Sequence, residues 1–184
     1  MKIRDAENSD TAELARIKKP EAIHRDRIRD AAEGEFRYLV CVDDSGRICG
    51  HACLVFRRPR AWPPDPGNSP YPRVIDVMIA GERRRQGLGT AFMMGLEAIC
   101  RQAGLDQIHL SVDPDRNTTA LRFYQTLGYT AAPGEPQWRT WSFKDSEGNV
   151  HEGEGLDLRM SKMIAEPQNG GYSPPAARSD QSTP

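Results

Sequence analysis

The sequence predicts an α/β fold in which a mixed sheet carries helices on both faces. Short runs rich in β-branched and aromatic residues are bounded by glycine, proline and aspartate, as strands are. Between them lie longer segments with apolar residues at helical spacing. Along the chain these segments follow the order strand, two helices, three strands, helix, strand, helix and two strands, which predicts about seven strands and about four helices.

The expected elements are bounded by residues that start or stop regular structure. Ser9 or Asp10 can cap the first helix, Pro20 breaks it, and glycines end the later helices. The expected helices are Ser9–Lys18, the segment between Pro20 and Gly34, Gly87–Ala103 and Asn117–Leu127. The expected strands are Lys2–Arg4, Tyr38–Val42, Ile48–Phe56, Val74–Ile79, Ile108–Val112, Trp138–Phe143 and Leu156–Met163. Asp43–Gly46 should turn the first hairpin, and the polar Asp145–Gly155 segment should join the last two strands.

Two segments lack the pattern of regular structure. Pro59–Pro72 is crowded with proline, which lacks the N–H that a central strand needs, so it is expected to be a long loop or flap. The chain from Glu166 onward is rich in Gly, Pro, Ser and Gln and has no apolar face, so it is expected to be disordered. The sequence therefore predicts one domain over residues 1–164 and a tail over residues 165–184.

Composition and charge argue against several classes of protein. A formal net charge of −1 argues against a protein built to coat nucleic acid, and no apolar run is long enough to cross a membrane. The N-terminus carries no apolar signal stretch, so the cytoplasm is the expected compartment. The four cysteines form no metal-binding pattern with histidine, so we expect reduced, buried thiols and no metal.

A glycine-bearing turn between a strand and a helix predicts a phosphate-binding site. The turn is Arg84-Arg85-Gln86-Gly87-Leu88-Gly89-Thr90. The first N–H groups of a helix lack partners inside it, and the helix dipole favours an anion there. Gly87 and Gly89 let a ligand approach the backbone closely. The Gly-Lys-Ser/Thr ending of a Walker loop is absent, as is the third glycine of a dinucleotide fingerprint.

Two segments together resemble the GNAT superfamily of acetyltransferases. Arg84, Gly87 and Gly89 match its Arg/Gln-x-x-Gly-x-Gly/Ala pyrophosphate loop, although Arg85 stands where the family often has glycine. Asn117–Tyr129 resembles its Asn-x-x-Ala-x-x-x-Tyr-x-x-x-Gly-Phe/Tyr segment. The resemblance implies a mostly antiparallel mixed sheet and a binding site for acetyl-CoA. It assigns the following residues to that site: Met78, Ile79, Arg84, Arg85, Gln86, Gly87, Leu88, Gly89, Thr90, Asn117, Ala120 and Tyr124.

The resemblance also implies an N-acetyltransferase in which the amine attacks the thioester directly in a ternary complex. The Val74–Ile79 strand should diverge from the next strand, so that backbone groups near Met78 and Ile79 hold the thioester. Tyr124 should be the general acid toward the CoA thiolate, or it only positions the sulfur. Asp76 is the first candidate for the base, but it could equally bond neighbouring backbone or an arginine. His109, Asp113 and relayed water are further candidates.

The acceptor is expected to be a primary amine of a small molecule or peptide. Trp62 and Tyr71 could form an aromatic wall beside it, with Trp138 and Trp141 as additions if they are not half core and half surface. Homodimers are frequent in the family. Two other classes stay open: a catalytically silent acyl-CoA-binding module on the same fold, and an interaction domain that offers its proline-rich segments to partners.

Overall fold

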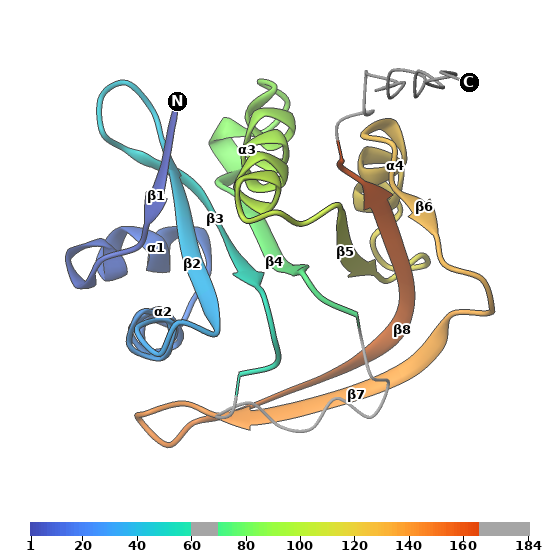
Figure 1. Cartoon of the computed structure of the whole chain (residues 1–184). Helices are drawn as coiled ribbons and strands as arrows, with labels where there is room; N and C mark the ends of the chain where they lie inside the picture. Colours follow the sequence, from blue (N-terminus) through green and yellow to red (C-terminus); the bar gives the residue numbers. More distant parts are fainter. Residues whose placement is uncertain (60–69, 166–184) are drawn as a thin grey trace, which may run out of the picture.

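A computed structural model describes residues 1–59 and 70–165, which form one open sheet with helices on both faces (Figure 1). The strands are β1 (Lys2–Asp5), β2 (Phe36–Val42), β3 (Ile48–Val55), β4 (Arg73–Ile79), β5 (Gln107–Val112), β6 (Thr130–Ala131), β7 (Gln137–Lys144) and β8 (Val150–Met163). The helices are α1 (Thr11–Ile17), α2 (Glu21–Ala31), α3 (Leu88–Gln102) and α4 (Thr118–Thr126). The predicted fold class is confirmed.

The sheet is almost divided between β4 and β5. Its strand order is β1-β2-β3-β4-β5-β8-β6, and β7 pairs with β8. Every neighbouring pair is antiparallel except β4 and β5, which run parallel and meet only where Arg73 pairs with His109. Beyond that point the two strands diverge, as the resemblance implied. The rest of β4 therefore lacks a partner on its β5 side among the described residues.

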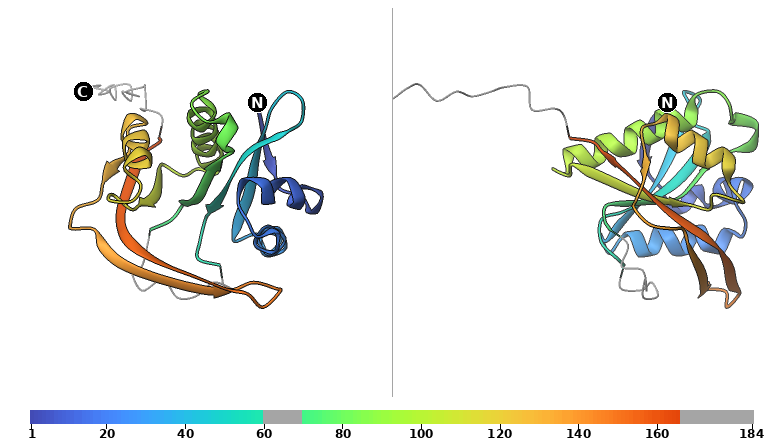
Figure 2. Two further views of the ribbon diagram at one scale, coloured as in Figure 1. Left: turned by 180° about the vertical axis from the view of Figure 1, so that it is seen from behind. Right: turned by 90° about the vertical axis from the view of Figure 1, so that its right-hand side faces the viewer.

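Each face of the sheet has its own core. Phe92 and Leu96 of α3 and Tyr124 of α4 pack on one face with side chains of β3, β4, β5 and β8. On the other face, Leu14 of α1 and Ile28 of α2 pack on β2 and β3. Every residue of β3 is buried because this strand is covered on both faces. Figure 2 shows α3 and α4 on one side of the sheet and α1 and α2 on the other.

A β-bulge lies in the middle of β4. Ile75 pairs with Cys53 and Met78 with His51, so two residues of β4 stand opposite one residue of β3. Asp76 is one of the two, and its φ of 53° lies in the left-handed region. A bulge redirects side chains and releases backbone groups from the ladder. This one lies beside the gap between β4 and β5.

The C-terminal hairpin is much longer than expected. Strand β8 begins at Val150, so most of the predicted Asp145–Gly155 connection is in fact strand paired with β7. The hairpin sweeps from the sheet toward α2 (Figure 1). There Arg25 of α2 forms an ion pair with Glu147, and the Ser146 N–H donates to the Asp26 carboxylate at 2.8 Å.

The remaining expectations concern the first helix, an additional strand, the cysteines and the segments outside the described residues. The first helix is shorter than predicted because residues Asn8–Asp10 form a 3-10 turn, in which the Asp10 carboxylate accepts the Glu7 N–H at 2.8 Å. Strand β6, with two residues, was not predicted. All four cysteines are free and buried, as expected. Trp62, most of the Pro59–Pro72 segment and the tail from Glu166 onward lie outside the described residues.

Candidate active site

The predicted phosphate loop connects β4 to α3 with a tightly curled backbone. Arg85 and Gly87 both have left-handed conformations, with φ values of 61° and 77°. The Arg84 side chain turns back, and its Nε donates to the carbonyl oxygen of Ile79 at 3.0 Å, which ties the loop to the end of β4. Successive N–H groups in such a curl can face one side and bind an anion.

The N-terminus of α3 has donors to offer a ligand. The first helical bond runs from the Ala91 N–H to the Gly87 carbonyl, so the N–H groups of Leu88, Gly89 and Thr90 are not used inside the helix. No side chain caps this end within the described residues. The loop and the first turn of α3 therefore fit the pyrophosphate of acetyl-CoA, which needs several N–H donors and no obstructing side chain.

Helices α3 and α4 meet at this loop. A Cβ atom added to Gly89 would lie 3.3 Å from Cζ of Phe123, so the absence of a side chain allows the two helices to approach. The next residue, Tyr124, is buried and stacks edge-on against Tyr129 with ring centroids 5.9 Å apart. Burial raises the pKa of Tyr124 to about 12, so its phenol stays protonated at neutral pH.

Asn117 and Ala120 open the helix that carries Tyr124. Asn117 stands at the N-cap of α4 and is exposed, and Ala120 is partly buried against the core. The Asn117 N–H donates to the Asp113 carbonyl at 3.0 Å, which fixes the turn after β5. The predicted residues of the α3 loop and of α4 are thus brought to the same side of the sheet.

Met78 and Ile79 lie at the end of β4 where the gap beside β5 is open. Their position is fixed by the close approach of β3, because a Cβ atom on Gly50 would lie 2.4 Å from the carbonyl oxygen of Met78. Only glycine fits this place without displacing β4. Sequence reasoning missed Gly50, although a glycine inside a predicted strand is a known signal of a bulge or close backbone contact.

Asp76 is held by two cations rather than free to accept a proton. Its carboxylate receives Lys18 Nζ at 2.6 Å and also forms an ion pair with Arg27 of α2. Burial alone raises the pKa of Asp76, but Arg27 and Lys18 lower it by more, so it lies well below its usual range. The structure thus contains the alternative arrangement, in which Asp76 bonds an arginine.

Two buried histidines surround this ion-pair cluster. His24 Nε2 lies 2.6 Å from the Lys18 carbonyl oxygen, which can only accept, so Nε2 carries a proton and Nδ1 accepts from the Tyr38 hydroxyl at 2.6 Å. His51 is fully buried, and neither ring nitrogen bonds to another described residue. Burial lowers the pKa of His51 to about 3, so the ring is neutral at pH 7.

The remaining candidates are dispersed. Asp113 accepts the N–H groups of Asp115, Arg116 and Leu156, so it organises the turn after β5. Tyr71 packs against the core beneath α1 and α2. Trp138 and Trp141, which could have been half core and half surface, are both more than half exposed, at 55% and 53%.

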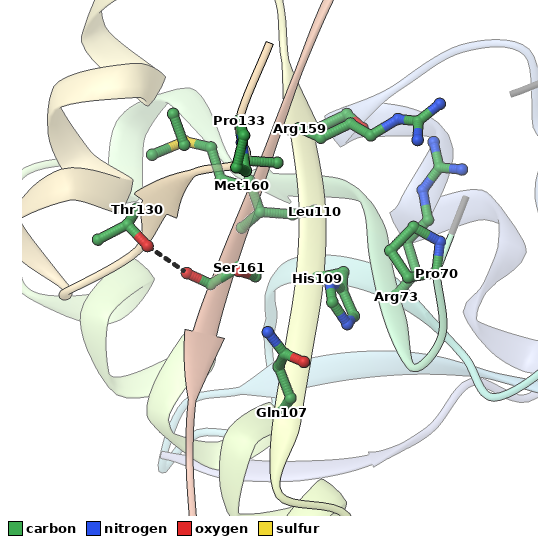
Figure 3. Close-up of a pocket in the computed structure, with 13 residues that line it drawn as sticks. Pro70, Arg73, Gln107, His109, Leu110, Thr130, Pro133, Arg159, Met160 and Ser161 are labelled. Atoms are coloured by element: carbon green, nitrogen blue, oxygen red, sulfur yellow. Dashed lines mark hydrogen bonds between the residues drawn. The ribbon is translucent and has the colours of Figure 1, made fainter. Parts of the chain in front are cut away.

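A cavity of about 370 Å³ lies on the α1 and α2 face of β5 and β8, beside the closed end of the gap (Figure 3). Its polar lining includes Arg73, Gln107, His109, Ser111 and Arg159. The sequence pattern did not predict that these residues share a site, although it made His109 a candidate base. They lie on strands that become neighbours only in the folded sheet.

Comparison with known proteins identifies the family to which this chain belongs. The model of the Acetyltransferase (GNAT) family matches residues 2–129. A mycothiol acetyltransferase from Thermobispora bispora is 41% identical over 63 residues, which cover 34% of this chain and 21% of that protein. The chain thus matches about a fifth of that relative's length.

Solved structures share the fold. The ribosomal-protein-S18-alanine N-acetyltransferase from Escherichia coli aligns with a TM-score of 0.58 and 16% identity, over 93% of this chain and 98% of that one. A phosphinothricin acetyltransferase from Sinorhizobium meliloti in complex with acetyl-CoA aligns with a TM-score of 0.59 and 17% identity, over 94% and 95%. None of the helices in the described part of the chain is long and apolar enough to cross a membrane. The chain belongs to the GNAT acetyltransferase family.

Proposed function

We propose that this protein transfers the acetyl group of acetyl-CoA to a primary amine by direct attack in a ternary complex. One observation supports the proposal: the N-terminus of α3, whose first N–H groups are not used inside the helix, follows β4, whose edge toward β5 is open beyond Arg73. Acetyl-CoA supplies an electrophilic thioester carbonyl. A homodimer and a cytoplasmic location stay predictions.

In this proposal, different groups of the chain bind the cofactor, stabilise the oxyanion and supply a proton. The loop from Arg84 to Thr90 binds the pyrophosphate, and a backbone N–H near Met78 or Ile79 stabilises the oxyanion of the tetrahedral intermediate. Tyr124 donates its proton toward the departing sulfur, since its raised pKa keeps that proton in place at neutral pH. Asn117 and Ala120 line the entry of the pantetheine arm.

The amine must lose a proton before or during attack. A lysine-like amine has a pKa near ~10.4, so only a small fraction is nucleophilic at pH 7. We assign Asp76 a positioning role, because Lys18 and Arg27 already hold its carboxylate. The proton then leaves through water on the α1 and α2 face of the sheet.

The test is acetyl-CoA binding by calorimetry with a matched pair of variants at Thr90, an exposed residue in the first turn of α3. Thr90→Glu places a carboxylate where the pyrophosphate should bind, while the helix dipole keeps the helix stable. We expect acetyl-CoA to bind the wild type and Thr90→Gln at micromolar concentration, and Thr90→Glu at least tenfold more weakly. A folded wild type that does not bind acetyl-CoA, or equal binding by both variants, refutes the site.

Catalysis is tested separately through Tyr124→Phe. If the protein is an acetyltransferase, this variant binds acetyl-CoA normally but releases CoA slowly with amine acceptors. If the protein is a silent acyl-CoA-binding module, wild type and variant release CoA equally slowly with every amine.

A further inference from the structure

The residues on either side of β4 point their backbone groups to opposite sides of the strand. Before β4, the Pro72 carbonyl oxygen accepts the His109 N–H of β5 at 2.9 Å, so it points toward β5. After β4, the Ala80 N–H donates to the Cys49 carbonyl oxygen of β3 at 2.8 Å, so it points toward β3. In a regular strand, alternate residues bond to the same neighbour, so two even-numbered residues should point the same way. The direction therefore changes within β4.

The bulge at Asp76 lies between these two points and gives β4 one residue more than the facing part of β3. One extra residue exchanges the sides to which the later backbone groups point. Beyond the bulge, the Met78 carbonyl oxygen lies against Gly50 of β3, and Ala80 also bonds to β3. The N–H of Ile79, between them, therefore points toward the gap beside β5, and in an unbulged strand it would point toward β3.

Two ion pairs hold the bulge in its conformation. The φ of Asp76 is 53°, which an L residue adopts at a cost and keeps only where its surroundings determine it. One carboxylate oxygen of Asp76 lies 2.6 Å from Lys18 Nζ, and the other forms an ion pair with Arg27. The Asp76 side chain is only 15% exposed, so solvent screens these pairs weakly.

The two cations are themselves fixed to the helices. Lys18 directly follows α1, where its N–H donates to the Leu14 carbonyl oxygen at 3.0 Å and its own carbonyl oxygen lies 2.6 Å from His24 Nε2 of α2. Arg27 of α2 has its Cζ atom 5.6 Å from the centroid of the Tyr38 ring, on β2. The charges are thus anchored outside β4, so the carboxylate must meet them where they are.

We propose that Lys18 and Arg27 are positioning residues, which act through Asp76 to hold the bulge that points the Ile79 N–H into the gap. This rests on the proposed function, in which a backbone N–H near the end of β4 stabilises the oxyanion. Neither cation contacts the acetyl group. Helices α1 and α2 thereby set how strongly β4 polarises a thioester that lies on its open edge.

The experiment measures the carbonyl stretch of bound acetyl-CoA by isotope-edited infrared spectroscopy, with the label on the acetyl carbonyl carbon. A hydrogen bond to a carbonyl lowers its stretching frequency, so wild type should lower it relative to free acetyl-CoA. In Lys18→Met at least half of this shift should be lost, whereas Lys18→Arg keeps the charge and should retain it. Lys19→Met removes an exposed neighbouring charge and should leave the shift unchanged.

Prior calorimetry with acetyl-CoA separates the two hypotheses. If wild type does not bind acetyl-CoA, or binds it without lowering the stretch, the proposed function fails. If wild type lowers the stretch and folded Lys18→Met lowers it equally, the function stands and the positioning role is wrong. A loss of acetyl-CoA affinity in Lys18→Met also overturns it, because positioning leaves the affinity unchanged.

Asp76→Asn is a second, independent variant. Asparagine keeps the shape of aspartate and tolerates a left-handed conformation, but it lacks the charge that Lys18 and Arg27 bind. We expect the same loss of the carbonyl shift as in Lys18→Met. An undiminished shift in folded Asp76→Asn contradicts the proposal, because the bulge then keeps its conformation without the two ion pairs.

Discussion

The buried His51 should make the stability of this protein fall in mildly acidic solution. In the unfolded chain an imidazole titrates near ~6.5, whereas in the folded protein burial lowers the pKa of His51 to about 3. Its folded pKa is depressed, so the full stability is present above pH 6.5 and is lost as pH falls toward 3. Between pH 7.5 and 5.5 only the unfolded chain binds this proton, which costs the native state about 1–2 kcal/mol.

The perturbation is His51→Leu, an apolar replacement of similar volume. Since both ring nitrogens of His51 lack a partner among the described residues, the replacement leaves no new group unsatisfied. Urea unfolding followed by circular dichroism at pH 7.5 and 5.5 gives the free energy of unfolding at each pH. The wild type should lose about 1–2 kcal/mol more than His51→Leu over this interval.

A control separates titration from packing. Met93→Leu changes another fully buried side chain but adds or removes no titrating group, so it should shift the free energy of unfolding equally at both pH values. The pKa of His24 is also lowered by burial, but His24 is present in every variant. Its contribution to the pH dependence of stability therefore cancels when variants are compared. If His51→Leu loses as much stability as wild type between the two pH values, His51 is not held neutral and the reasoning fails.

Three further predictions concern catalysis and packing. Tyr124→Phe should lower kcat by about 10²–10⁴ with acetyl-CoA affinity unchanged, measured by CoA release; an undiminished kcat would rule Tyr124 out as the acid. Gly50→Ala should destabilise the fold by about 1–3 kcal/mol and reduce activity, since the new Cβ atom meets the Met78 carbonyl oxygen; a wild-type Tm would contradict this contact. Lys162→Met should cost about 3–5 kcal/mol in urea unfolding, because it leaves the buried Glu97 without the ammonium that lies 2.8 Å away, and Lys162→Arg should restore part of it.

The sequence predicted those parts of the fold that have a strong hydrophobic period. Helix α3 was predicted to within a residue at each end because its apolar residues recur at helical spacing and Gly104 follows it. The first part of β8 was missed because its polar residues alternate with Gly153 and Gly155. That part is ordered by pairing with β7, which a local pattern does not reveal.

Candidate site residues could be predicted where they belong to short motifs. They could not be predicted where the site is formed by strands that are far apart in the sequence. Gly87 and Tyr124 could be assigned to the candidate site because motif and element coincide in sequence. The bulge at Asp76 was not predicted, because Val74–Ile79 has the pattern of an ordinary strand. Aspartate also tolerates a left-handed conformation, so the residue type gives no warning. Arg73 and Arg159 come together only through the order of β4, β5 and β8.

The single backbone pairing between β4 and β5 has a mechanical consequence. It leaves the sheet as two blocks, β1–β4 and β5–β8, joined by one rung at Arg73–His109 and by the core beneath α3 and α4. If acetyl-CoA binds in this gap, as proposed, it bridges the two blocks and should reduce the motion of strands that it does not contact. At a concentration 100 times its Kd, such a ligand adds about 2.7 kcal/mol to the stability of the whole sheet.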